Sequence, residues 1–378
     1  MLTGGRNLRY KYVHIFNSQD FKFIPKLLNA VNSNEQVFKI EDHLFVTPHK
    51  KVYDLIKQYP NVVLTDLKGA AIVNSFGKNA DWVIIHSFSD AVDALLIKRK
   101  IAGRVIWRTW GHDLFRNNEE KFTLKYILKV IREYLFSRKI EKFYAVAGAN
   151  CIDEFNIFLK SKCKRFYRLP YTYEEGIHTY YQSLNIKSNH NGGFRIMIGY
   201  SGDRNNNHIE IINRIRPYLK ENITIVLVLA YMPGNQDYVQ SVIEYANRMI
   251  PDNLEIVDKF IPFREYIDFL NNIDVAIFDS KNSYALGNIS ILTKLGKTIY
   301  LNDGGIIHNA FKKTGFPHYC TSEILHLDKE NNPLLLNYNP DDYGDLCAID
   351  DLEFLKRWKT FLSDLSCAEE IKEERSHL

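Results

Sequence analysis

The sequence predicts an α/β protein of two domains, each a parallel β-sheet flanked by helices, with a cleft between them. Three observations support this prediction. The chain has 378 residues, which is more than a single hydrophobic core usually organises. In both halves, short apolar segments alternate with amphipathic segments of helical period, which is the pattern of βαβ units. A polar stretch ending in Asn-Gly-Gly separates the halves. We therefore predict domains at 1–175 and 194–350, a linker at 176–193, and a last helix with a tail at 351–378.

Strands and helices alternate along the first half. The predicted strands are residues 12–16, 37–40, 45–47, 61–64, 82–85, 105–107 and 143–146, and the predicted helices are 21–31, 51–57 and 91–101. Polar side chains follow three of these strands, at 14–20, 86–90 and 110–113. Ligands of open parallel sheets bind at the carboxyl ends of strands, so these three clusters are candidate binding residues.

The second half repeats the pattern. The predicted strands are 194–200, 224–229, 254–257, 274–278 and 298–301, and the predicted helices are 207–219, 237–248, 263–271, one that opens within 284–290, and 352–365. The charged tail 369–378 is expected to fray.

The stretch 195–210 combines a strand, a polar glycine turn and a helix. Ser201, Gly202 and Asp203 form the turn, and Arg204 follows them. Free backbone N–H groups and a helix N-terminus at such a turn favour an anion such as a diphosphate. The alternative is an ordinary turn that Asp203 fixes, with Arg204 paired to an acid. The stretch is neither G-x-G-x-x-G nor a Walker loop, which removes the usual support for dinucleotide or NTPase function.

A second candidate phosphate site opens the helix after strand 274–278. Gly287 permits close approach of the backbone, and Asn288 or Ser290 is expected to cap the helix. Two helix N-termini at strand ends in one domain suit a nucleoside diphosphate. Capped helices after polar loops are common, so this signal is weak alone.

Composition excludes several classes of protein. The net charge of +4 does not argue for nucleic acid. The five cysteines form no C-x-x-C pair, which fits a reducing cytoplasm. The sequence leads us to expect no signal peptide, and its longest apolar run, 223–232, is far below the ~20 residues of a membrane span. No His/Cys spacing predicts a zinc site, and no cofactor motif is present.

Basic and apolar residues interleave between Arg116 and Lys142. The apolar positions, which include Ile131 and Tyr134, recur at helical spacing. One interpretation is a basic amphipathic helix on an anionic bilayer, at the cytoplasmic face of the inner membrane. The other is a long surface helix packed on its own domain.

Several blocks together resemble the family of TDP-4-acetamido-4,6-dideoxygalactose transferases, which act on lipid-linked intermediates of enterobacterial common antigen. The motif W-x-x-W-G-x-D-L stands at 107–114, G-D-R-x-N-x-H-I at 202–209, and Y-x-P-x-N-x-x-Y at 231–238. The glycine segment and next strand match at 287–302, and His14 and His86 fall where the family has strand-end histidines. The resemblance covers residues 12–305.

The resemblance implies a bacterial glycosyltransferase of the GT-B type: two Rossmann-like domains facing a cleft, with the donor on the C-terminal one. The last helix would cross back to the first domain. The expected partners are a TDP- or UDP-sugar and a polyprenyl-diphosphate-linked saccharide, with no bound metal. Donor-binding candidates are residues 201–204, Tyr231, Gly287, Asn288 and Ser290, and acceptor-binding candidates are His14, His86 and Trp110.

The chemistry requires stabilisation of the departing diphosphate and activation of an acceptor hydroxyl. Arg204 is the candidate for the first task. Asp113 is the candidate general base, with the alternative that it caps the helix that follows it. Trp107, Trp110 and Tyr231 are candidates for stacking on sugar or base, although core packing is the expected role of Trp107.

Two other functional classes remain open from sequence. One is a nucleotide-sugar epimerase or hydrolase of the same architecture, which would need no acceptor. The other is a non-catalytic nucleotide-sugar-binding module, which would bind the donor without consuming it.

Overall fold

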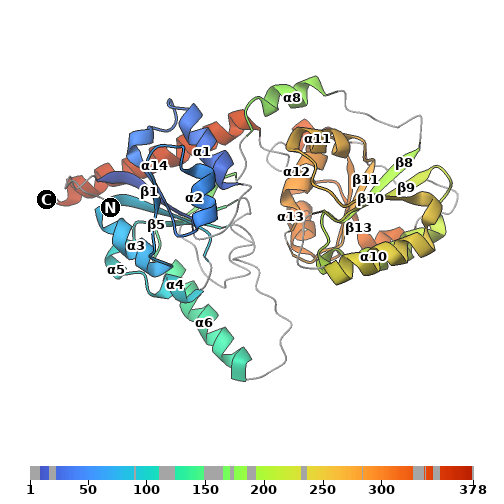
Figure 1. The fold of residues 1–378 in the computed structure, drawn as a ribbon, viewed down its shortest axis with the longest axis horizontal. Coiled ribbons are helices and arrows are strands. Elements are labelled where there is room, and N and C mark those ends of the chain that lie inside the picture. The colour runs from blue at the N-terminus through green and yellow to red at the C-terminus, as the bar shows by residue number, and fades with distance from the viewer. Residues whose placement is uncertain are drawn as a thin grey trace. The chain divides into compact units, whose positions relative to one another are not determined.

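The computed structural model describes residues 9–16, 23–88, 91–109, 124–148, 165–170, 174–184, 193–230, 236–282, 284–326, 336, 338–343 and 350–376. The chain divides into two compact units, unit 1 with residues 1–182 and 350–378, and unit 2 with residues 183–349. The predicted linker 176–193 contains a helix, α8 (Ile177–Ser183). Each unit consists of a sheet and its surrounding helices (Figure 1).

Unit 1 contains a parallel sheet in the order β3-β2-β1-β4-β5-β6-β7. Its strands are β1 (Tyr10–Phe16), β2 (His43–Thr47), β3 (Val62–Leu64), β4 (Ala80–His86), β5 (Val105–Arg108), β6 (Ala145–Gly148) and β7 (Phe166–Arg168). Its helices are α1 (Ile24–Ser33), α2 (Lys50–Ile56), α3 (Ala70–Phe76), α4 (Ala91–Leu95), α5 (Arg99–Ala102), α6 (Leu124–Ile140), α8 and α14 (Asp351–Ser376). The central strands are buried along most of their length, as expected of a parallel sheet covered on both faces.

Unit 2 contains a parallel sheet in the order β10-β9-β8-β11-β12-β13. Its strands are β8 (Phe194–Ile198), β9 (Ile223–Val228), β10 (Leu254–Val257), β11 (Val275–Phe278), β12 (Thr298–Leu301) and β13 (Tyr319–Cys320). Its helices are α9 (His208–Ile215), α10 (Gln236–Met249), α11 (Phe263–Asn271), α12 (Leu286–Lys294) and α13 (Ile306–Thr314). The predicted α/β class with two parallel sheets is confirmed.

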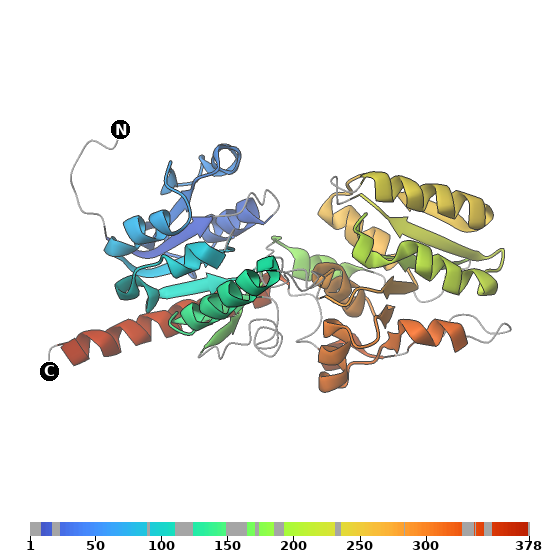
Figure 2. The same cartoon turned by 90° about the horizontal axis from the view of Figure 1, so that it is seen from below.

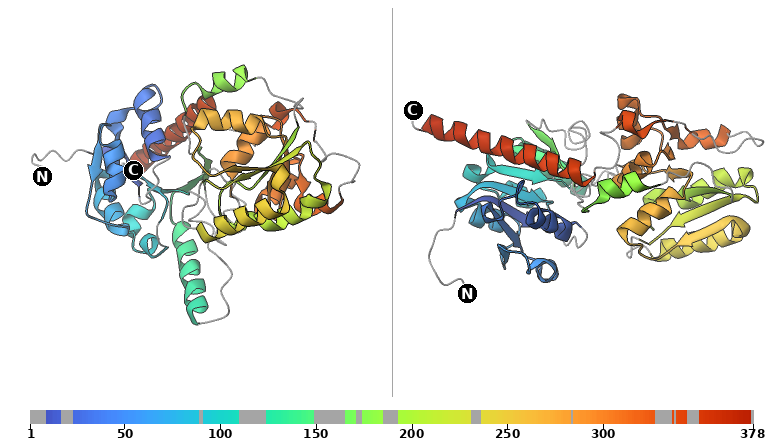
Figure 3. Two further views of the ribbon diagram at one scale, coloured as in Figure 1. Left: turned by 45° about the vertical axis from the view of Figure 1, so that its right-hand side comes forward. Right: turned by 90° about the horizontal axis from the view of Figure 1, so that it is seen from above.

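Helix α14 returns to unit 1 and packs along its sheet (Figures 2 and 3). Trp358 is fully buried, and its ring lies 5.6 Å from that of Phe38. Phe361 packs on Tyr167 of β7 at 4.8 Å. The expected return of the last helix therefore has a physical cause: one apolar face of α14 completes the core of unit 1.

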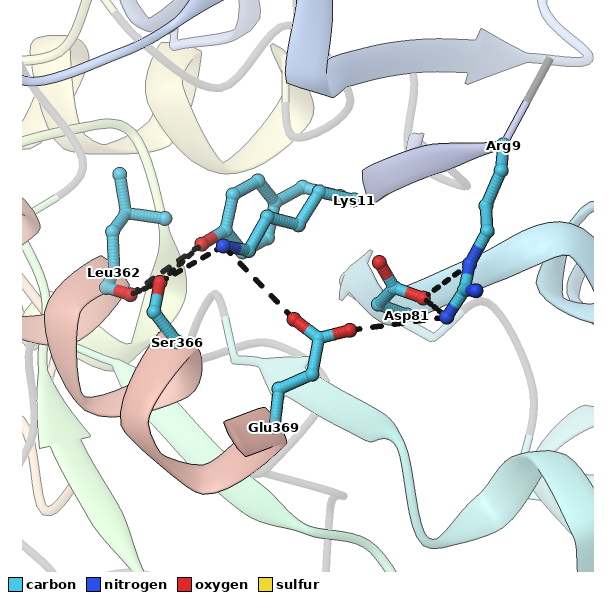
Figure 4. Close-up of polar contacts among 7 residues, drawn as sticks. Arg9, Lys11, Asp81, Leu362, Ser366 and Glu369 are labelled. Carbon is cyan, nitrogen blue, oxygen red and sulfur yellow. Dashed lines mark hydrogen bonds and ion pairs between the residues drawn. The ribbon is translucent and has the colours of Figure 1, made fainter. Parts of the chain in front are cut away.

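The tail predicted to fray is instead the continuation of α14 as far as Ser376. Its described contacts explain the difference (Figure 4). Lys11 donates to the Ser366 hydroxyl at 3.1 Å, and Glu369 lies 3.9 Å from both Lys11 and Arg9. One residue of the predicted tail, Glu369, thus lies against Arg9 and Lys11 at the start of β1.

Two other predicted elements differ. Residues 37–40 form no strand, because buried Phe38 packs edge-on to His43 and against Trp358. The predicted helix 91–101 divides into α4 and α5, because the Asn74 side chain bonds the backbone between them. Its amide nitrogen donates to the Leu96 carbonyl at 3.0 Å, and its oxygen accepts from the Lys98 N–H at 2.8 Å. Both differences come from tertiary contacts that periodicity does not report.

Among the described helices, none combines the length and the low charge that crossing a bilayer requires.

Candidate donor site

The sheet of unit 2 has a switch point between β8 and β11. Successive strands extend from β8 through β9 to β10 on one side, and from β11 through β12 to β13 on the other. Ile196 of β8 pairs with Val275 of β11, and the Gly199 N–H donates to the Ile277 carbonyl at 2.9 Å. Ligands of such sheets bind at the carboxyl ends of the strands at this point. Both predicted donor segments, 201–204 and 287–290, follow these two strands.

The turn after β8 is held by its own polar side chains. The Asp203 carboxylate accepts from the Asn205 N–H at 2.8 Å and caps a single 3₁₀ turn, Arg204–Asn206. Asn206 is buried, and its amide donates to the Ser201 carbonyl at 2.9 Å. Ser201 is fully buried as well. Asp203, Asn206 and Ser201 therefore shape the turn, and Arg204 is exposed on it together with Asn205.

Two glycines in this loop serve packing. A Cβ at Gly202 would collide with Val239 of α10. Gly199 has a φ of +70°, and a Cβ there would lie 2.5 Å from Nε2 of His208. Both positions require glycine because α10 and the first residue of α9 press on the loop. By contrast, a Cβ at Gly287 would meet nothing within 4 Å among the described atoms.

The Arg204 guanidinium lies over the ring of Tyr238, 5.3 Å from its centroid. The Tyr238 hydroxyl and Nδ1 of His208 are 3.2 Å apart. Burial raises the pKa of Tyr238 and lowers the pKa of His208 to about 4, so both are neutral at pH 7. Arg204 forms no ion pair with any residue that the structure describes, and its positive charge remains available to an anion.

Helix α12 begins without a side-chain cap. Its N-cap is Ala285, in a left-handed conformation with φ of 61°, and neither Asn288 nor Ser290 caps the helix as predicted. The reason is position: the helix begins at Leu286, so both side chains lie inside its first turns. No acidic residue lies in the first turn. Among the residues that the structure describes, no side chain therefore caps the first N–H groups of α12.

The loops after β8 and β11 contact each other. The rings of Tyr200 and Tyr284 lie 6.5 Å apart. Burial, and then the negative charge of Asp203, raise the pKa values of both tyrosines. Asn207, the N-cap of α9, donates from its amide to the Asp279 carboxylate at 3.0 Å. Unit 2 thus brings the two predicted donor segments to one edge of its sheet.

In unit 1, His14 and His86 lie together but are fully buried. Nδ1 of His14 is 3.0 Å from Nε2 of His86, and Nε2 of His14 is 2.9 Å from Nδ1 of His43. The buried Arg108 places one guanidinium nitrogen 3.3 Å from Nδ1 of His86. Neither predicted acceptor-binding histidine presents an exposed side chain, and that role stays a prediction.

Arg108 fixes the protonation of this histidine chain. A guanidinium only donates, so Nδ1 of His86 accepts, and the proton of its neutral ring is on Nε2. His86 then donates to His14, and His14 donates to His43. Burial is the main cause that lowers all three pKa values, that of His43 to about 3. We refer to Arg108, His86, His14 and His43 as the histidine relay.

A family model described as 4-alpha-L-fucosyltransferase, glycosyl transferase group 56, matches residues 23–329. The chain belongs to this family. The predicted resemblance is therefore confirmed, and glycosyl transfer is the activity of the family.

Solved structures share the fold of this group 56 member. A trehalose 6-phosphate synthase from Burkholderia multivorans aligns with a TM-score of 0.62 and 9% identity, over 97% of this chain and 98% of that chain. Anabaena HepE in complex with UDP aligns with a TM-score of 0.56 and 12% identity, over 97% and 100%. A glycosyltransferase from Rickettsia africae aligns with a TM-score of 0.55 and 11% identity, over 97% and 98%. These likenesses show the GT-B fold.

Three predicted site residues of this group 56 member lie outside the described residues: Trp110, Asp113 and Tyr231. Their roles stay predictions. Trp107 is fully buried against Phe88 and Phe136, which confirms core packing. Within the described part of the chain, no cluster of three or more His, Cys, Asp or Glu side chains could hold a metal ion.

Sequence reasoning missed His43, Arg108, Tyr238 and Asp279. Asp279 is the first polar residue after the apolar strand β11, so the strand-end rule that selected Ser201 would have selected it too. Arg108 and His43 gave no such signal, because a basic residue at a strand end is ordinarily exposed.

Proposed function

We propose that this protein transfers a sugar from a TDP or UDP donor to a polyprenyl-diphosphate-linked saccharide in bacterial surface polysaccharide synthesis. The sugar is an amino deoxy sugar of the 4-acetamido-4,6-dideoxygalactose type or another hexose. Unit 2 binds the donor and unit 1 the acceptor. The uncapped N-terminus of α12, beside the loop that carries Arg204, is the observation on which the proposal depends.

The two helix N-termini at the switch point differ in charge. Helix α9 has Glu210 in its first turn, and its N-cap Asn207 is bonded to the Asp279 carboxylate. Helix α12 has neither an acid in its first turn nor a side-chain cap, and Gly287 leaves open space there. The positive end of the α12 dipole is therefore the better site for a diphosphate.

The chemistry follows from this placement. An acceptor hydroxyl oxygen attacks the anomeric carbon, the bond from that carbon to the diphosphate oxygen breaks, and the nucleoside diphosphate leaves. Arg204 and the first N–H groups of α12 stabilise the charge that develops on the leaving oxygen. Asp113 takes the hydroxyl proton. No divalent metal is required, because these groups supply the positive charge.

A ligand screen followed by a transfer assay tests this function. TDP- or UDP-sugars are expected to raise the melting temperature of the protein, since they bind the native state only. Donor consumption is then expected only when a lipid-linked saccharide is present, and EDTA is expected to leave the rate unchanged. Donor turnover without acceptor would favour an epimerase or hydrolase, and binding without turnover would favour a non-catalytic module.

We further propose that α6 rests on the anionic cytoplasmic face of the inner membrane, where the lipid-linked acceptor is located. An apolar stripe on this helix is exposed: Val130 (45%), Ile131 (50%), Tyr134 (63%) and Leu135 (47%). Helix α6 extends beyond the rest of unit 1 (Figures 1 and 3). The exposed Arg138 flanks the stripe, although it also pairs with Glu141 at 2.8 Å. An exposed apolar stripe beside basic residues suits a bilayer of anionic lipid.

Sedimentation with vesicles that contain anionic lipid tests this contact. Replacing both Ile131 and Tyr134 by Ser removes two large exposed apolar side chains and is expected to lower the bound fraction about tenfold. The matched control is Leu55→Ser on α2, which is 45% exposed and is expected to bind as the wild type does. Equal sedimentation of the double variant and the control would rule out α6 as the membrane contact.

A further inference from the structure

Asp279 lies at the end of β11, and only 4% of its surface is exposed. Three side chains donate to its carboxylate. Oδ1 accepts from the Asn302 amide at 2.8 Å and from the Thr321 hydroxyl at 2.6 Å, and Oδ2 accepts from the Asn207 amide at 3.0 Å. The Asn207 amide also bonds the Asp279 carbonyl at 3.0 Å. The buried charge is therefore well solvated by protein donors.

Each donor comes from a different strand end. Asn207 belongs to the turn after β8, Asn302 follows β12, and Thr321 follows β13. With its own loop after β11, the carboxylate joins the ends of four adjacent strands. These are the loops that border the switch point where the donor site was placed.

We propose that Asp279 is a positioning residue for the donor site. Its hydrogen bonds fix the loop that carries Arg204 and the loop that precedes α12. Its negative charge at the N-terminus of α9 directs the donor diphosphate to the N-terminus of α12. The inference rests on the proposed function. A direct catalytic role does not fit, because the carboxylate is buried and both of its oxygens are occupied by donors.

The Asp279–Asn207 pair allows a test by exchange. In Asp279→Asn, an amide replaces the carboxylate oxygen that faces the Asn207 amide, so two donors meet. In Asn207→Asp, two carboxylates meet at the same place. The double variant restores one donor and one acceptor between the two side chains with the total charge unchanged, and it loses only the bond from side chain 207 to the main-chain carbonyl of residue 279. Asn309→Asp on α13 is the control, since it adds the same charge and Asn309 has no bond to Asp279.

Two readouts separate positioning from folding. The first is the affinity of the folded protein for UDP and TDP by calorimetry. Each single variant is expected to lose at least about tenfold, and the double variant is expected to return to within about threefold of the wild type. The second is hydrogen exchange at 199–207, 302–305 and 321–323, which is expected to rise together in the single variants and to recover in the double variant.

The outcomes are distinguishable. If the wild type binds UDP or TDP and the Asp279→Asn variant binds it equally well, the positioning role is overturned, even if hydrogen exchange increases in the variant. If hydrogen exchange rises in only one of the three loops, the inference that Asp279 holds them together is overturned. A wild type that binds neither nucleotide overturns the proposed function, and with it the donor part of this inference.

Discussion

The Arg204→Ala variant is expected to lose about 100-fold in kcat/KM, because removal of one group that stabilises leaving-group charge costs about 3 kcal/mol. The guanidinium is exposed over the Tyr238 ring and forms no ion pair with a described residue. Its removal therefore leaves the core of unit 2 intact. The measurement is steady-state transfer from the donor found in the ligand screen, together with the melting temperature of the variant.

Arg214→Ala is the matched control for this variant. Arg214 lies on α9, in the same unit, and its guanidinium is paired with Glu210 at 3.1 Å. It is expected to keep wild-type transfer within about twofold, since i,i+4 ion pairs on a helix contribute about 0.3–0.5 kcal/mol. Unchanged kcat/KM in Arg204→Ala would show that the diphosphate is bound elsewhere.

The stability of unit 1 is expected to fall steeply as pH drops below about 6.5. His14, His43 and His86 are buried, and burial lowers their pKa values, that of His43 to about 3. In the unfolded chain they regain a pKa of about 6.5 and take up protons that the folded unit does not bind. Each such proton adds about 1.4 kcal/mol per pH unit to the slope, with stability rising as pH rises.

Glu369 opposes this trend. Burial and the neighbouring Asp81 raise its pKa from 4.5 to about 7, so the folded unit retains a proton that the unfolded chain releases, and stability falls as pH rises through this range. On unfolding between pH 4.5 and 6.5, the three histidines take up three protons and Glu369 releases one, so the net uptake is two protons. The expected slope is about 3 kcal/mol per pH unit.

Denaturant titrations across this pH range give the measurement. His43→Phe removes one titrating ring and is expected to lower the slope of stability against pH by about 1.4 kcal/mol per pH unit, which corresponds to one proton. Glu369→Gln removes the opposing group and is expected to make the slope steeper. A slope that neither substitution changes would show that the relay and Glu369 do not govern the acid response.

Sequence predicted the features of the site that depend on neighbours along the chain. The turn at Ser201–Asp203 and the glycine at 287 that permits close approach follow from local conformational preferences and local capping bonds. The capping of α12 by Asn288 or Ser290 was wrong, because the helix begins at Leu286 and places both residues too late. A one-residue change in a helix boundary decides which side chain can cap it.

Patterns of residue type did not separate a binding histidine from a core histidine. His14 and His86 follow the same strand-end rule as the donor residues, yet both are buried in the relay. Their environment depends on α14, whose Trp358 lies 6.4 Å from the His14 ring although the two are far apart in sequence. Similarly, the hydrogen bonds of the Asp279 carboxylate depend on three loops that meet only when the sheet forms.

By itself, the sequence determined the two α/β halves, the order of most strands and helices, and the family, because alternating apolar periods and short motifs are local signals. Only the tertiary structure decided which polar residues are buried, which helix N-terminus lacks a side-chain cap among the described residues, and which side chains of the last helix enter the core of unit 1. Those properties arise from contacts between strand ends and helices distant in sequence, and burial and charge pairing are fixed only when these segments come together.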